Sequence, residues 1–387
     1  MPQENVLFLK RLNDPLLEPP FSDLRKICAQ KNITTIVINN LTEIMYGHQV
    51  ESFDAQIADL PHKICVLTHN SSHPSTVYNK IGMEWCAHTG WIWENVSAPR
   101  HIAQGIVSDS HNRSYTRRQI DNTRGLMFLG KLRWSSRILF WDAFISENLH
   151  SEFYYSYYPL LKHSQVYQHQ QESLSEITHR GHELRISPLD WDNYAQIAVD
   201  YDLSDQLPES APDRSNVFYC GYPTDPELYQ KTTYSLVPET TSGSETWTPF
   251  ATEKTYRAIQ NYHPYLSVGD LGLNKHMNSE LGYENFLEEF DVTDCDLNTD
   301  IMSPGLSVSD LGKAIRHAHD TFQGNFEKNF KRIQEKVYFN RQHWQSSAEI
   351  YRSKLRVWDH AECWDHNLDP IPNLCDYITH TQGIYLY

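Results

Sequence analysis

The sequence predicts an α/β fold in two domains that face each other across a cleft, with C-terminal helices. Short apolar runs alternate with amphipathic stretches in both halves of the chain, which is typical of parallel sheets covered by helices. The chain has 387 residues, enough for about two domains. Hydrophobic residues make up 40% of it and charged residues 21%, so each half can bury a core, and a disordered chain is excluded.

The first half has the pattern of a Rossmann-like domain. Its apolar runs predict strands, and the segment between the first two runs has the spacing of an amphipathic helix. We assign residues 1–120 to an N-terminal α/β domain. The predicted strands are 6–9, 35–38, 64–67 and 105–107, and the predicted helix is 21–30.

The second half repeats the alternation and predicts a further α/β domain over residues 121–335. A strand at 125–129 leads into a helix at 134–148, and two strands at 233–237 and 265–268 enclose a helix at 252–261. The segment 150–215 is rich in Tyr, His, Ser and Gln, and we expect irregular structure there.

The last part of the chain predicts one long helical region and a loop-like tail. Ser307 and Ser309 are suitable N-caps, and helical spacing of apolar residues continues toward residue 357. The tail from residue 359 is aromatic and without clear periodicity. We expect residues 336–387 to form a helix and tail that pack back on the N-terminal domain.

Two local patterns point to a phosphate-bearing ligand. Glu239 follows a strand directly, and Thr252, Glu253 and Lys254 begin the next helix, where backbone N–H groups and a lysine favour anions. An ordinary helix start explains the Thr-Glu-Lys run equally well. Residues 113–137 carry a net charge of +6 in a chain whose net charge is −16. That segment holds Lys131, Arg133 and Arg137, which can clamp a diphosphate; the alternative is a solvated basic surface.

The residues Arg124-Gly-Leu-Met-Phe-Leu-Gly-Lys-Leu-Arg-Trp-Ser-Ser-Arg137 resemble the opening of the C-terminal domain in a group of phage and bacterial proteins that look like glycosyltransferases of the GT-B fold. The segment from Glu239 to Lys254 resembles the nucleotide-sugar motif of α-1,3-fucosyltransferases. The run Leu281-Gly-Tyr-Glu-Asn-Phe286 looks like a segment that follows in the same group. The resemblance covers about half of the chain, roughly from Arg124 to Tyr338.

The resemblance implies roles for these residues. It places Glu253 on a ribose and Lys254 on the diphosphate, with Arg133 or Arg137 as a second phosphate ligand and Glu239 facing the donor sugar or base. One departure is Thr240-Thr241, where the family has Asn-Ser. The resemblance further implies a metal-independent, inverting transfer to an acceptor hydroxyl, with the nucleotide sugar as co-substrate and no other cofactor.

The N-terminal domain is expected to bind the acceptor. Inverting transfer needs a group that deprotonates the acceptor hydroxyl, so the catalytic base is expected from this domain. His69 follows a predicted strand directly, and Glu94 lies in the aromatic run Trp91-Ile-Trp-Glu, where apolar walls raise the pKa of a carboxyl group. Asp14, Glu84 and Asp109 are further candidates.

The acceptor stays open between a glycan or surface polymer and hydroxymethylated cytosine in phage DNA, and a non-catalytic binding protein on a transferase scaffold is the alternative function. The basic segment favours DNA, whereas the net charge of −16 opposes it.

No metal site is expected, because the Asp294-Cys-Asp296 run reads as an acidic loop. No apolar run reaches the ~18 residues of a membrane helix, and the seven cysteines are scattered. We therefore expect no membrane insertion and a cytoplasmic protein, in the host cytoplasm if a phage encodes it.

Overall fold

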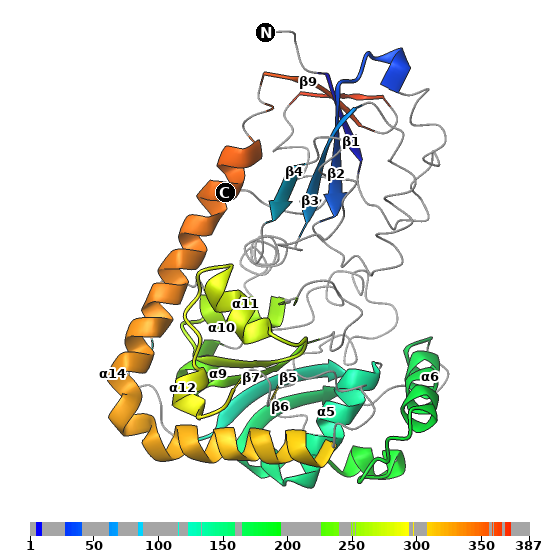
Figure 1. Cartoon of the computed structure of the whole chain (residues 1–387). Coiled ribbons are helices and arrows are strands. Elements are labelled where there is room, and N and C mark those ends of the chain that lie inside the picture. Colours follow the sequence, from blue (N-terminus) through cyan, green and yellow to red (C-terminus); the bar gives the residue numbers. More distant parts are fainter. Residues whose placement is uncertain are drawn as a thin grey trace, which may run out of the picture. The chain divides into compact units, whose positions relative to one another are not determined.

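The computed structural model is an α/β protein with two sheets that are mainly parallel, as the sequence predicts (Figure 1). The chain divides into two compact units. The first comprises Met1–Val96, Glu245–Phe250 and Gln345–Tyr387, and the second comprises Ser97–Ser244 and Ala251–Trp344. The structure describes residues 5–9, 28–40, 62–68, 84–87, 115, 123–132, 134–158, 165–194, 226–239, 249, 251, 253–293, 297, 308–355, 358, 360–365 and 368–372.

The first unit holds a six-stranded sheet in the order β10-β9-β1-β2-β3-β4. All neighbouring strands are parallel except β9 and β10. Val6, Leu7 and Phe8 of β1 are fully buried, as is usual for a parallel strand whose two faces are covered. The strands are β1 (Asn5–Leu9), β2 (Thr35–Asn40), β3 (Lys63–Thr68), β4 (Glu84–Ala87), β9 (Glu362–Asp365) and β10 (Pro370–Ile371).

The tail of the chain is not loop-like throughout, and that prediction is wrong. β9 pairs in parallel with β1, with Val6 opposite Cys363, and β10 folds back antiparallel on β9. Strands of four and two residues carry almost no periodic signal of their own. β9 depends on backbone hydrogen bonds with β1, which lies more than 350 residues earlier in the chain, and β10 depends on those with β9.

The second unit holds a four-stranded parallel sheet in the order β6-β5-β7-β8. The chain passes from β5 to β6 on one side and then returns to β7 on the other side of β5, which makes the β5–β7 boundary the switch point of the sheet. The elements are β5 (Gly125–Lys131), α5 (Ser135–Ser146), β6 (Phe153–Tyr158), α9 (Pro226–Lys231), β7 (Ser235–Pro238), α10 (Glu253–Gln260), β8 (Tyr265–Val268), α11 (Leu273–Ser279) and α12 (Leu287–Phe290).

The expectation of irregular structure over residues 150–215 is wrong for the described part of that segment. It contains the short helix η2 (Leu149–Glu152), the edge strand β6, the helix α6 (Gln165–His179) and the short helix η3 (Pro188–Tyr194). Aromatic side chains suit a half-buried strand. Phe153 is fully buried, and the Tyr155 ring lies 5.7 Å from that of Trp141, so these two rings pack in the core.

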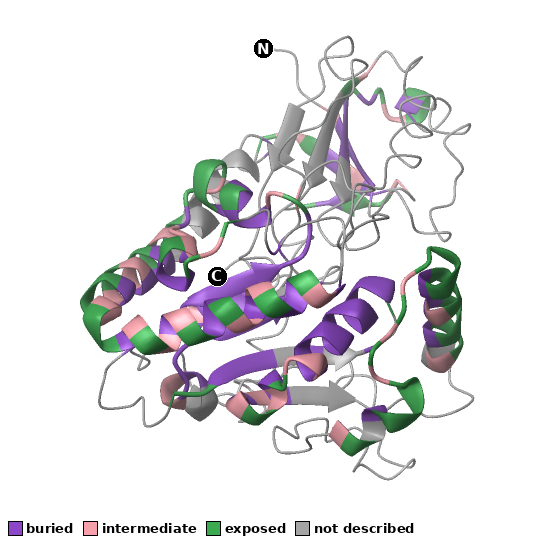
Figure 2. Cartoon of the chain, turned by 60° about the horizontal axis from the view of Figure 1, so that its bottom comes forward, coloured by how far each residue is buried: buried purple, intermediate pink, exposed green. Residues whose placement is uncertain are grey.

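The predicted C-terminal helix is α14 (Val308–Leu355), a single helix of 48 residues. Its buried residues recur at helical spacing and face the core of the second unit (Figure 2). Phe322 stacks on Phe290 of α12 at 4.4 Å between ring centroids, and Phe330 stacks on Tyr115 at 5.6 Å. The buried stripe includes Val308, Leu311, Ile315, Ala318, Phe322, Phe326, Ile333 and Val337.

Within the described residues, no helix is both long enough and apolar enough to cross a bilayer. This includes α14, most of whose exposed residues in the second unit are charged.

Candidate functional site

The carboxyl ends of β5, β7 and β8 meet at one edge of the second sheet, because these strands are parallel neighbours. In open α/β sheets this edge, and above all the switch point, is where ligands bind. Buried polar residues gather here: Glu239 directly follows β7, and Asp270 lies two residues beyond β8. Both carboxyl groups are about as buried as the core, at 2% exposure.

Glu239 is held by contacts from two other elements. Its backbone N–H donates to the Val268 carbonyl at 2.8 Å, which extends the β7–β8 pairing past the end of β7. The Thr255 hydroxyl of α10 donates to its Oε1 at 2.7 Å. The first turn of α10 therefore contacts the end of β7, although residues 239–252 separate the two elements in the sequence.

A second hydroxyl completes this arrangement. Thr255 Oγ1 lies 2.7 Å from Ser267 Oγ, on β8. A threonine hydroxyl has one proton, and an ionised carboxylate can only accept, so the proton of Thr255 is directed at Glu239 and Ser267 donates to Thr255. Thr255 and Ser267 are both fully buried.

Two buried cations lie in the first turns of the helices that follow β5 and β7. Arg137 in α5 is 5% exposed, and Lys254 in α10 is 6% exposed. The first-turn N–H groups of both helices also favour anions. Two buried cations and two helix N-termini therefore lie at the same edge of the sheet as the carboxylates of Glu239 and Asp270.

The turn after β8 is fixed by its own hydrogen bonds. The Asn274 side-chain amide donates to the Ser267 carbonyl at 2.9 Å, and the Leu273 N–H donates to the Asp270 carbonyl at 3.1 Å. Gly272 has φ +80°, the left-handed conformation that glycine adopts without strain. Asp270 is thereby placed at the same edge as Glu239.

Helix α6 packs on the turn between β5 and α5. Gln170 donates to the Leu132 carbonyl at 3.0 Å, and the Ser135 hydroxyl donates to Glu176 at 2.6 Å. Buried residues recur along α6 at Gln170, Ser173 and Ile177, whereas most of its surface is exposed (Figure 2). α6 therefore fixes the chain just after β5 and the start of α5.

The structure brings three of the predicted donor-binding residues to this edge: Arg137, Glu239 and Lys254. Lys131 is the last residue of β5 and Glu253 the first residue of α10, and the structure describes only their backbone. The predicted catalytic residues His69 and Glu94 lie outside the described residues, as do Arg133, Thr252, Asp14, Asp109 and the run from Asp294 to Asp296.

The basic residues of segment 113–137 that the structure describes do not form one surface. β5 separates Arg124, just before the strand, from Lys131 at its end, so the two residues lie at opposite edges of the sheet. Arg124 is exposed, with its guanidinium 4.9 Å from the centre of the Tyr154 ring, whereas Arg137 is buried.

Sequence reasoning missed Thr255, Ser267, Asp270 and Asn274. For Asp270 there was a usable signal, a Gly-Asp pair directly after a predicted strand. Thr255 and Ser267 gave none, because their contacts depend on how α10 returns to the sheet.

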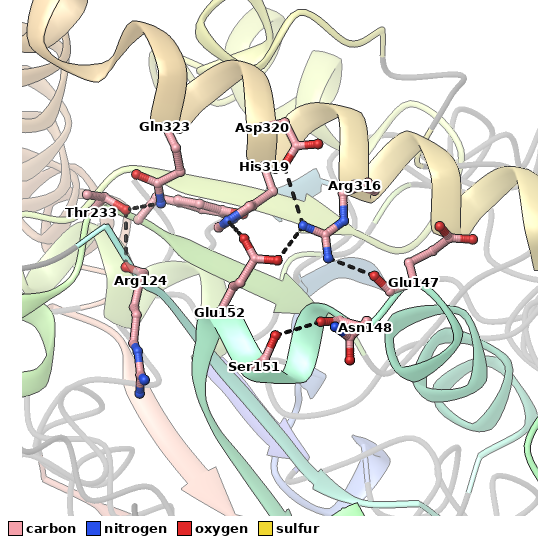
Figure 3. Close-up of polar contacts among 11 residues, drawn as sticks. Arg124, Glu147, Asn148, Ser151, Glu152, Thr233, Arg316, His319, Asp320 and Gln323 are labelled. Carbon is pink, nitrogen blue, oxygen red and sulfur yellow. Dashed lines mark hydrogen bonds and ion pairs between the residues drawn. The ribbon is translucent and has the colours of Figure 1, made fainter.

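The opposite edge of the sheet, where the strands begin, carries a different polar cluster that joins α14 to the start of β6 (Figure 3). Arg316 Nη1 donates to Glu152 Oε1 at 2.5 Å, and Nη2 donates to the Glu147 carbonyl at 2.7 Å. His319 lies between Glu152 Oε2, at 3.0 Å, and the Tyr234 hydroxyl, at 3.1 Å. Burial lowers the pKa of His319 below its ordinary value, against the opposing charge of Glu152.

Glu152, His319 and Asp320 have possible metal-ligating atoms within 4.8 Å of one another. Arg316 already bridges both carboxylates of this group, since Nη1 also lies 3.4 Å from Asp320 Oδ1. Burial raises the pKa of Glu152, but the hydrogen bond and charge of Arg316, with help from His319, bring it below its ordinary value. The geometry is that of an ion-pair network that fastens α14.

His263 is a second buried histidine at this edge. Its Nδ1 lies 2.7 Å from the Ser235 hydroxyl and its Nε2 lies 3.0 Å from the Thr232 carbonyl. A carbonyl only accepts, so Nε2 carries the proton of a neutral ring and Nδ1 accepts from Ser235. Burial lowers the pKa of His263 to about 3, despite the hydrogen bond to Thr232.

No protein-family model matches this chain, and no curated protein matches its sequence.

Proposed function

We propose that the chain is a glycosyltransferase that moves a sugar from a nucleotide-sugar donor to an acceptor hydroxyl. The observation that carries the proposal is the pair of buried cations, Arg137 and Lys254, in the first turns of the two helices that follow β5 and β7. These two strands flank the switch point of the second sheet, and a diphosphate is the ligand class that such a pair of helix starts suits best.

Glu239 supplies the second requirement of a donor site. A nucleotide sugar offers hydroxyl groups on its ribose and its sugar, and a carboxylate accepts hydrogen bonds from them. Glu239 is a buried carboxylate at the end of β7, at the same edge as Lys254. The site thus combines cations for the phosphates with an acceptor for hydroxyl groups.

The proposed reaction is an inverting transfer in which the acceptor oxygen attacks the anomeric carbon and the bond to the nucleoside diphosphate breaks. Negative charge grows on the departing phosphate oxygen, and Arg137 and Lys254 stabilise it there. The acceptor proton passes to a base, for which His69 and Glu94 are the candidates. We further propose a GT-B arrangement, in which the second unit binds the donor and the first unit binds the acceptor.

The proposed acceptor is a glycan hydroxyl, because the net charge of −16 disfavours a polyanionic substrate. Hydroxymethylated DNA is tested beside it. A non-catalytic binding protein on the same scaffold differs from an enzyme in one respect: it binds the nucleotide sugar without releasing nucleoside diphosphate in the presence of any acceptor.

A thermal-shift screen with UDP, GDP, CMP and their sugar conjugates tests the donor site. A nucleotide at 100 times its Kd raises the free energy of unfolding by about 2.7 kcal/mol. We expect a shift with one nucleotide class, its loss in Lys254→Ala, and its retention in Lys313→Ala, which removes a lysine that is 67% exposed. If no nucleotide shifts the wild-type protein, the proposal fails.

A further inference from the structure

We infer that Thr255 and Ser267 are positioning residues for donor binding, which act by holding the Glu239 carboxylate in one orientation. The inference rests on the proposed function and extends it, since neither residue belongs to the sequence motif that suggested the site. It assigns to Glu239 a ligand group that presents O–H or N–H donors, such as the vicinal hydroxyls of a ribose or hexose.

The three residues come from three different elements. Glu239 follows β7, Ser267 lies in β8, and Thr255 lies in the first turn of α10. The hydrogen bonds from Ser267 to Thr255 and from Thr255 to Glu239 are both 2.7 Å long. Exposure is 0% for both hydroxyl residues and 2% for Glu239. Water is thus excluded from this hydrogen-bond relay of Ser267, Thr255 and Glu239, and contacts within the protein fix the orientation of the carboxylate.

The relay is directional. Ser267 donates to Thr255, and Thr255 in turn donates to Glu239, because the carboxylate cannot donate. A hydrogen bond to an ionised carboxylate is stronger than one between neutral groups. It also fixes the carboxylate rotamer, so a ligand meets a preorganised acceptor and the side chain loses less conformational freedom on binding.

The Ser267 end of the relay is itself held in place. The Asn274 side-chain amide donates to the Ser267 carbonyl at 2.9 Å, which ties β8 to the start of α11. The order of the chain of contacts is therefore α11, β8, α10 and the end of β7. It terminates on a carboxylate at the edge of the sheet where ligands bind.

A buried threonine at the opposite edge provides the comparison. The Thr233 hydroxyl donates to the Arg124 carbonyl at 3.1 Å and accepts from the Gln323 amide at 2.7 Å (Figure 3). It is as buried as Thr255, at 0% exposure, but its contacts end on backbone and on an amide. Thr233 thus stabilises the fold without preparing a charged group for a ligand.

The test compares Thr255→Val, Thr255→Ser, Ser267→Ala, Glu239→Gln and the control Thr233→Val. The Kd of the nucleotide sugar that stabilises the wild-type protein is measured by titration calorimetry, and the melting temperature of each variant is recorded. We expect Thr255→Val to weaken binding about tenfold, Thr255→Ser to restore it to within about threefold, and Ser267→Ala to fall between them. Thr233→Val is expected to lower the melting temperature with an unchanged Kd.

The following results would overturn the positioning role of Thr255 and Ser267. If Thr255→Val binds as the wild type does, the positioning role is overturned while the donor site stands. If Glu239→Gln binds as the wild type does, the positioning role and the part of Glu239 in the donor site are both overturned, while the proposed phosphate contacts of Arg137 and Lys254 stand. If Thr233→Val weakens binding as much as Thr255→Val, the effect is general destabilisation, and the positioning role is again overturned. If the wild-type protein binds no nucleotide or nucleotide sugar, the proposed function and the positioning role fail together, because Glu239 then has no such ligand to meet.

Discussion

Arg316 donates to Glu152 at 2.5 Å across 164 residues of sequence. The same guanidinium caps the Glu147 carbonyl near the end of α5, so one side chain connects α14, α5 and the start of β6. Such a connection is expected to hold the first half of α14 on the sheet.

Replacing Arg316 by alanine should lower the free energy of unfolding by about 2 kcal/mol, because the carbonyl of Glu147 and the carboxylate of Glu152 both lose a charged partner. Urea unfolding measures the loss. Lys331→Ala is the control: it removes an exposed pair with Glu335 at 3.9 Å and should change stability by less than about 0.5 kcal/mol. Equal effects of the two substitutions would contradict a special role for Arg316.

The same substitution should change the response to acid. The pKa of Glu152 is lower in the folded state than its ordinary value of 4.5, so its contribution to stability is complete above that pH and is lost as the pH falls through the folded pKa. Arg316→Ala is expected to flatten this acid-dependent loss below pH 4.5. If the free energy of unfolding falls with acid in the variant as steeply as in the wild type, the pairing of Arg316 with Glu152 is contradicted.

His263 should make the protein sensitive to mild acid. Its folded pKa of about 3 lies below its ordinary value of 6.5, so the unfolded chain binds a proton that the folded chain does not. Its contribution is complete above pH 6.5 and falls steadily toward pH 3; at pH 5 the loss is about 2 kcal/mol.

Urea unfolding at pH 7 and pH 5 measures this dependence. In His263→Gln we expect lower stability at pH 7, with a smaller difference between the two pH values. The control is His169→Gln, at an exposed position on α6. A wild-type pH dependence that survives in His263→Gln would assign the effect to other histidines.

Gly125 is required by the ring of Phe153. A Cβ at position 125 would lie closer to three atoms of that ring than real contacts allow. Gly125→Ala should therefore cost about 1–3 kcal/mol, and Phe153→Leu in the same chain should recover part of the loss. Gly324 in α14 has open space around it, so Gly324→Ala is expected to stabilise the helix by up to about 1 kcal/mol. Thermal unfolding of the two glycine variants shows whether stability falls in Gly125→Ala and rises in Gly324→Ala.

Phe290 lies at the centre of the contact between α12 and α14. It stacks on Phe322 at 4.4 Å and meets the edge of Tyr234 at 4.8 Å, with no exposed surface. Phe290→Ala should cost about 3–5 kcal/mol. Phe339 in the same unit is 46% exposed, and Phe339→Ala should cost less than about 1 kcal/mol in the same urea assay.

Much of the second sheet could be predicted from the sequence, because β5, β7 and β8 are continuous apolar runs beside helices with clear spacing. β6 was missed, since the tyrosines of its sequence Phe-Tyr-Tyr-Ser-Tyr-Tyr make the run look polar although Phe153 and Tyr155 are buried. For the site, Glu239 and Lys254 were recognisable from their place after a strand and at a helix start. Their partner Thr255 was not, because its contact with Glu239 exists only once α10 has docked.

The pairing of β9 with β1 has a consequence for the order of folding during synthesis. The ribosome exposes β5, β6, β7 and β8 well before β9, so the second sheet can assemble while the first still lacks two of its strands. Until then the outer edge of β1 presents unpaired backbone groups, which invite pairing with other chains. The nascent protein therefore passes through a stage in which a buried strand of the finished sheet is an open edge, and this is when we expect it to depend most on chaperones.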